Sequence, residues 1–73
     1  MMENSDSIIG STIEYEFKKG ILQEGVVIDK IQMLHQDKNE NNNITTVTGY
    51  LVLDVETEKI TPITYWRITR LFE

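Results

Sequence analysis

The side chains best suited to recognising a ligand or partner lie near the C-terminal end of the sequence. Tyr65, Trp66 and Arg67 are consecutive and Arg70 follows three residues later; the chain has no other tryptophan or arginine. Aromatic rings stack on bases, and guanidinium groups pair with phosphates. The same residue types are enriched as anchors of protein interfaces. The segment therefore predicts a ligand pocket or a contact surface, unless Trp66 covers one end of the hydrophobic core.

Other residues of catalytic type lack partners. His35 is the single histidine, and the chain has no cysteine. A nucleophilic triad or a zinc site needs several such groups at recognisable spacing. The glycines are too dispersed for a phosphate-binding loop. We therefore expect a protein that is not an enzyme and that has no catalytic residues, no metal and no cofactor.

Acidic residues alternate at one strand end. Asp54, Glu56 and Glu58 are spaced by two, which places them on one side of an extended chain. Paired carboxylates can perform acid–base chemistry or bind calcium. Charged residues at the end of a strand are more often solvated, so we expect a polar face here. Glu14 and Glu16 have the same interpretation.

Length and charge restrict the class of protein. The chain has 73 residues and a net charge of −5, with an isoelectric point near 4.7. Duplex nucleic-acid binders need a basic face, so we do not expect one. No apolar run approaches the ~20 residues of a membrane helix, and the acidic start is not a secretory signal. We expect a soluble cytoplasmic domain without membrane contact, and self-association, because so short a chain buries only a small core.

Composition predicts the fold class. The chain contains ten isoleucines, five valines, eight threonines and no alanine. β-Branched side chains favour strands, and alanine is the best helix former. We expect an all-β protein: a five-stranded antiparallel meander that forms a small, partly open barrel. Residues 1–7 are expected to be disordered, and residues 8–73 to form a single domain.

Alternation and turn residues divide the chain into elements. We expect strands over residues 12–17, 25–34, 44–55, 60–63 and 68–72, and a 3₁₀ turn over 64–67. The phase of the second strand changes near Asp29 and Lys30, which predicts a bulge or a strong bend. Residues 35–43 contain no apolar side chain and are expected to form a mobile hairpin loop. Gly49 marks a bend or a close backbone approach, and Pro62 places its strand at a sheet edge or a strand end.

This pattern resembles a known architecture. Five strands with a bent second strand and a 3₁₀ turn before the last are similar to a small Src-homology-type barrel. Lys19-Gly20 followed by Gly25-Val26-Val27-Ile28 also resembles the KOW motif of ribosomal and transcription-factor barrels, over residues 10–34. The resemblance implies the barrel fold. The family's RNA-binding role is not carried over, because that motif normally lies in a basic chain.

The function expected from these features is that of a non-enzymatic binding module that forms a homo-oligomer. The expected contact surface contains Tyr65, Trp66, Arg67 and Arg70. The size and the asparagine-rich composition resemble those of short phage proteins. One alternative is therefore a phage anti-defence sponge that sequesters a small anionic signalling nucleotide, of cyclic or ADP-ribose type, at an oligomer interface. A second alternative is a single-stranded nucleic-acid binder.

Overall fold

The computed structural model describes residues 8–37 and 43–72, and these residues form five strands and a 3₁₀ turn. The strands are β1 (Thr12–Lys18), β2 (Ile21–Asp37), β3 (Asn43–Asp54), β4 (Ile60–Thr64) and β5 (Ile68–Phe72), and the turn η2 covers Tyr65–Arg67. The expected all-β class, the 3₁₀ turn and the last strand are confirmed. The disorder expected for residues 1–7 lies outside the described residues.

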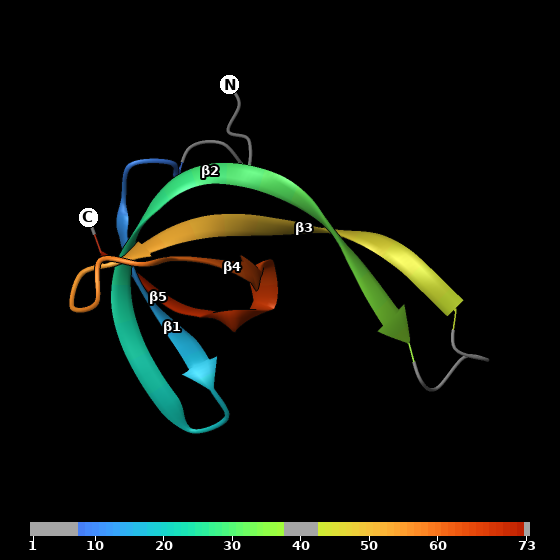
Figure 1. The fold of residues 1–73 in the computed structure, drawn as a ribbon, viewed down its shortest axis with the longest axis horizontal. Coiled ribbons are helices and arrows are strands. Elements are labelled where there is room, and N and C mark those ends of the chain that lie inside the picture. Colours follow the sequence, from blue (N-terminus) through green and yellow to red (C-terminus); the bar gives the residue numbers. More distant parts are fainter. Residues whose placement is uncertain (1–7, 38–42, 73) are drawn as a thin grey trace.

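All five strands belong to one antiparallel sheet in the order β4-β3-β2-β1-β5. Consecutive strands pair from β1 to β4, and β5 then returns to pair with β1. The sheet curls toward closure but stays open between β4 and β5, which η2 connects (Figure 1). The expected partly open meander is therefore the observed fold.

The core lies on the concave side of this curled sheet. Alternation in β1 turns Ile13 and Tyr15 inward, and both are fully buried. β2, β3 and β4 supply the other buried apolar side chains, Val27, Tyr50, Val52 and Ile63. Ile8, Phe17 and Ile68 pack against this cluster and are partly buried. Every strand therefore contributes to a single small core.

β2 is longer than expected. The register with β3 shifts between Val27 and Asp29, so Ile28 is the extra residue of a bulge. The predicted bulge is confirmed, one residue earlier than Asp29. The expected loop was wrong at its ends, because β2 continues through His35 to Asp37 and β3 begins at Asn43. Hydrogen bonding between the two strands holds these polar residues in a ladder although they have no apolar pattern. The mobility expected for residues 38–42 lies outside the described residues.

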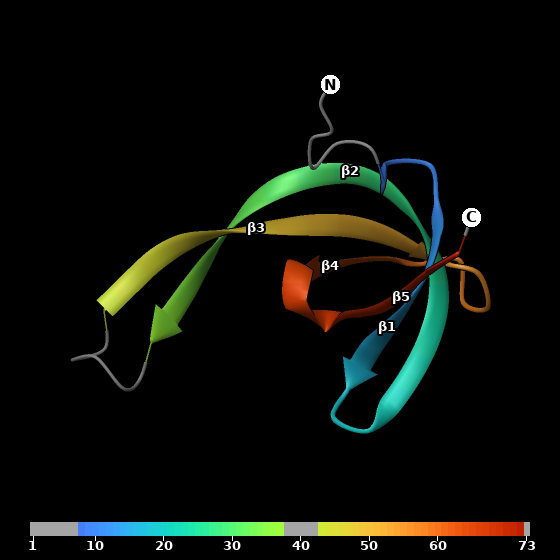
Figure 2. The same cartoon turned by 180° about the vertical axis from the view of Figure 1, so that it is seen from behind.

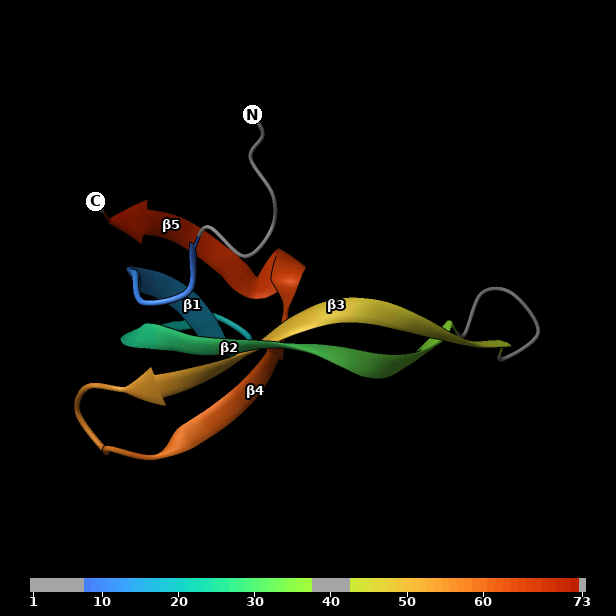
Figure 3. The ribbon, with the colours of Figure 1, turned by 90° about the horizontal axis from the view of Figure 1, so that it is seen from above.

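The extra length of β2 and β3 forms a two-stranded ribbon. We call this ribbon the arm: residues 31–37 of β2 paired with residues 43–49 of β3. Figures 1 and 2 show the arm extending beyond the other strands, and Figure 3 shows it from a second direction. The chain is broad and flat, with extents of 39 × 34 × 18 Å.

Two residues at the edge of the barrel have the roles expected from the sequence. Pro62 lies in β4, which is an edge strand and therefore tolerates a residue without an N–H. Gly49 lies where β4 ends beside β3, opposite Thr64. A Cβ atom on Gly49 would lie 2.7 Å from the carbonyl oxygen of Ile63 and would also collide with Met33. The close approach predicted for Gly49 is thus confirmed.

Candidate functional site

The turn η2 presents two aromatic side chains to solvent. β4 ends at Thr64, and the chain makes one 3₁₀ turn before β5 begins at Ile68. None of the three residues in this turn is buried. Tyr65 is 54% exposed and Trp66 is 48% exposed. Trp66 is therefore not a member of the buried core.

Three aromatic rings form a row from the turn to the arm, which we call the aromatic row. The rings of Tyr65 and Trp66 meet edge to face, with centroids 5.1 Å apart and an interplanar angle of 78°. The ring of His35, on β2, meets Trp66 in the same way at 5.0 Å and 77°. Edge-to-face contacts at this separation are favourable. The row therefore fixes the orientation of Trp66 and joins the turn to the arm.

The two arginines occupy different places. Nη1 of Arg67 donates a hydrogen bond of 3.2 Å to the carbonyl oxygen of Phe17, which ties the turn to the end of β1. Arg70 lies further along β5, opposite Glu14, and its guanidinium carbon is 5.8 Å from the ring centroid of Phe72. The structure thus brings Tyr65, Trp66 and Arg67 together on one turn and places Arg70 on β5, opposite Glu14.

Sequence reasoning missed the role of Asp54. This residue is 3% exposed, so the solvated face expected for it was wrong, whereas Glu56 and Glu58 are exposed. Oδ1 of Asp54 accepts hydrogen bonds from the backbone N–H groups of Glu56 and Thr57, at 2.8 and 3.0 Å. An aspartate that caps the next backbone N–H groups is a common turn signal, and the Asp-Val-Glu-Thr segment carried it.

The other carboxylate oxygen of Asp54 binds the core. Tyr15 donates its phenol hydroxyl to Oδ2 of Asp54 at 2.9 Å. The N–H of Thr57 lowers the pKa of Asp54, and the Tyr15 and Glu56 donors add to this although burial opposes it. Burial raises the pKa of Tyr15 to about 12, with further contributions from the hydrogen bond to Asp54 and from its charge. The pair is therefore an ionised carboxylate that holds a neutral phenol.

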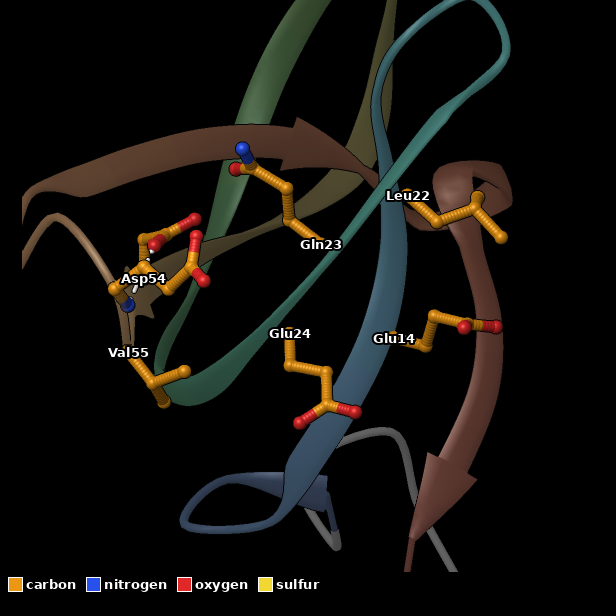
Figure 4. A pocket seen from close by; sticks show the side chains of 7 residues that line it. Glu14, Leu22, Gln23, Glu24, Asp54 and Val55 are labelled. Carbon is orange, nitrogen blue, oxygen red and sulfur yellow. Dashed lines mark hydrogen bonds between the residues drawn. The ribbon is translucent and has the colours of Figure 1, made fainter.

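A shallow hollow of about 300 Å³ lies next to this pair (Figure 4). It is lined by Glu14, Leu22, Gln23, Glu24, Asp54, Val55 and Glu56. Glu14 and Glu24 are directly opposite in the β1–β2 register. Figure 4 shows the Glu14 carboxylate reaching toward β5, where the hydroxyl of Thr69 donates a 2.8 Å hydrogen bond to it. Across residues 8–37 and 43–72, no three acidic or histidine side chains are placed to hold a metal ion. The hollow is an acidic surface feature that would repel an anion.

None of the helical segments in the described ranges is long and apolar enough to cross a membrane.

Comparisons with known proteins identify no family for this chain. No family model, no curated protein and no solved structure matches this chain.

Proposed function

We propose that this protein is a non-enzymatic binding module that acts as a homo-oligomer, with Tyr65, Trp66, Arg67 and Arg70 in its contact surface. The observation that carries the proposal is the exposure of Tyr65 and Trp66, at 54% and 48%, on a turn that is held in place. Large aromatic side chains that stay half exposed in a single chain gain the most from burial against a partner.

The contact surface is already ordered before any partner binds. Trp66 is held between Tyr65 and His35, and Arg67 fixes the turn to β1 through the Phe17 carbonyl. Side chains that are fixed in advance lose less conformational entropy on binding. This preorganisation favours a recognition role for the turn.

The small core favours self-association. Only six apolar side chains of the described residues are buried, and chains of this length bury a low fraction of their surface. Burial against further copies is a common way to add apolar contact. A homo-oligomer therefore supplies the stabilising surface that the single chain lacks.

Sedimentation of a Trp66→Ala variant tests the proposal. We expect the wild type to sediment as an oligomer and the variant to dissociate into smaller species while it keeps β-type circular dichroism. Loss of an interface anchor costs about 2 kcal/mol or more, which weakens association about thirtyfold. Ile60→Ala is the matched control, since Ile60 is 56% exposed on the edge strand β4. A wild type that sediments as a single chain at high concentration contradicts the proposal.

A small anionic nucleotide is the second candidate partner, favoured by one observation. The flat rings of Tyr65 and Trp66 and the guanidinium of Arg67 lie on the same turn. A guanidinium has five donors, and Arg67 gives one from Nη1 to Phe17. Cyclic dinucleotides and ADP-ribose at large excess should then raise the melting temperature of the wild type and leave that of Trp66→Ala unchanged. No shift in the wild type excludes this partner class.

A further inference from the structure

The outer edge of β3 loses its neighbour along the arm. β4 pairs with β3 from Gly49 to Leu53 and ends opposite Gly49. Within the described residues no strand pairs with that edge over residues 43–48. An isolated two-stranded ribbon is only marginally stable in water, and a free edge offers unpaired backbone groups to another strand.

This edge also lacks the devices that protect other edges. Residues 43–48 read Asn-Ile-Thr-Thr-Val-Thr, and no residue from Asn43 to Leu53 carries a charge. Proteins usually protect exposed edges with charges, proline or shortness. The two edge strands of the barrel have them: β4 contains Pro62, and β5 contains Arg70 and spans five residues. Residues 43–48 of β3 thus form an edge of six residues with no charge and no proline.

Exposed apolar side chains lie on one face of the arm. Leu34 is 77% exposed and Ile44 is 63% exposed, the highest values among the large apolar residues described. Leu34 is opposite Thr46 and Ile44 is opposite Gln36, so both side chains lie on the same face. Trp66 packs against His35, which belongs to the alternate positions of β2 and thus to the opposite face. The aromatic row therefore leaves the Leu34 and Ile44 face uncovered.

We propose that residues 43–48 pair antiparallel with the same residues of a second copy, so that two arms form one four-stranded sheet. This pairing rests on the homo-oligomer proposed above and adds a second contact between copies, separate from the surface around Trp66. The two-fold axis of such a pair is perpendicular to the sheet, and residues paired across it lie on the same face. One residue must then lie opposite its own copy at the axis. Thr45 and Thr46 are the two candidates, because they are at the centre of the segment.

The register explains the exposed side chains. With the axis at Thr45, Ile44 lies opposite Thr46 of the second copy, and the two Ile44 side chains become diagonal neighbours. Each Leu34, opposite Thr46 in its own chain, then joins the same apolar cluster. Four side chains, two from each copy, that are solvated in the single chain then gather on one face of the shared sheet.

A second copy fits this edge better than an unrelated chain does. The chain has a net charge of −5, so two copies repel one another in most relative orientations. The uncharged edge is a place where they can meet without juxtaposing like charges. An antiparallel contact between identical strands is also self-complementary, as a two-fold interface requires.

Single cysteines test the contact directly, because the chain has none of its own. Directly opposite Cβ atoms are about 4.5–5.5 Å apart, close to disulfide range. We expect Thr45→Cys or Thr46→Cys, whichever lies at the axis, to form a covalent dimer under mild oxidation. Gln36→Cys is the matched control on β2, where the two thiols would lie three strand spacings, about 14 Å, apart. No dimer from either threonine position, or an equal yield from Gln36→Cys, overturns the pairing.

Charge at the edge gives a second measurement. Ile44→Lys should weaken association about tenfold or more by sedimentation, whereas Gln36→Lys, opposite it on β2, should weaken it less than threefold. Equal effects count against the pairing. If Trp66→Ala dissociates the oligomer but a cysteine at neither threonine position crosslinks it, the proposed function stands and the arm contact is wrong. A wild type that is a single chain removes both.

Discussion

The phenol hydroxyl of Tyr15 donates a 2.9 Å hydrogen bond to Oδ2 of Asp54, joining β1 to the end of β3. Tyr15 is fully buried and Asp54 nearly so. The other oxygen of Asp54 holds the N–H groups of Glu56 and Thr57. One side chain therefore couples the core to the β3–β4 turn.

Removal of the Tyr15 hydroxyl should destabilise the fold. Tyr15→Phe keeps the ring but takes away the donor to a buried carboxylate, which costs about 1–3 kcal/mol of unfolding free energy. Urea unfolding followed by circular dichroism measures the change. Tyr65→Phe is the control, since Tyr65 is half exposed, and its effect should stay within about 0.5 kcal/mol. Equal effects of the two variants would show that the hydrogen bond adds nothing.

Acid should weaken the fold through Asp54. The hydrogen bond from the Thr57 N–H, with those from Tyr15 and Glu56, holds the pKa of Asp54 below its ordinary value of 3.8 in the folded state. The resulting stability is present above the ordinary pKa and is lost as the pH falls through the lowered folded pKa. Urea unfolding at a series of pH values below about 6 should show this loss in the wild type and a smaller loss in Asp54→Asn. An identical acid slope in both proteins would assign the loss to other carboxylates.

Alkali should weaken the fold through Tyr15. Burial, with the hydrogen bond to Asp54 and its charge, raises the pKa of Tyr15 from 10.0 to about 12. The folded state keeps this proton where the unfolded state releases it, so stability falls as the pH rises from 10 to 12. Tyr15→Phe should lack this component when the unfolding free energy is measured across that interval. A variant whose stability falls as steeply as that of the wild type contradicts the assignment.

Local sequence pattern accounts for most of the fold. β-Branched residues and alternation at Ile13 and Tyr15 predicted the strands and the buried face of β1. The phase change near Asp29 and Lys30 predicted a bulge or a strong bend, and Pro62 predicted a sheet edge or a strand end. These signals are short range, so a single sequence contains them.

Features set by distant residues could not be predicted. The partner of Asp54 is Tyr15, 39 residues away in sequence, so the burial of this carboxylate depends on the completed sheet. The extension of β2 to Asp37 is set by pairing with β3, because His35, Gln36 and Asp37 have no apolar pattern of their own. The contact of His35 with Trp66 requires both the arm and the turn. The candidate site was therefore predicted as a segment, and its link to the arm was not.

Gly49 should tolerate no side chain. A Cβ atom there would lie 2.7 Å from the carbonyl oxygen of Ile63, a backbone atom that cannot move aside without shifting β4. We expect Gly49→Ala to cost about 1–3 kcal/mol of unfolding free energy, as overpacking does. Thr48→Ala, one residue earlier in β3, is the control and should cost less than about 1 kcal/mol. Equal losses from the two variants in urea unfolding would show that β4 has room to shift.

The single tryptophan makes the link between turn and arm measurable. The ring of His35 contacts that of Trp66 edge to face, with centroids 5.0 Å apart, and such ring contacts contribute about 0.5–1.5 kcal/mol. We expect His35→Ala to shift the fluorescence emission of Trp66 to longer wavelength, because water replaces the imidazole. Gln36→Ala is the control, since it removes an exposed neighbour on β2 whose position faces away from Trp66. Unchanged emission in His35→Ala would mean that Trp66 does not contact His35 in solution.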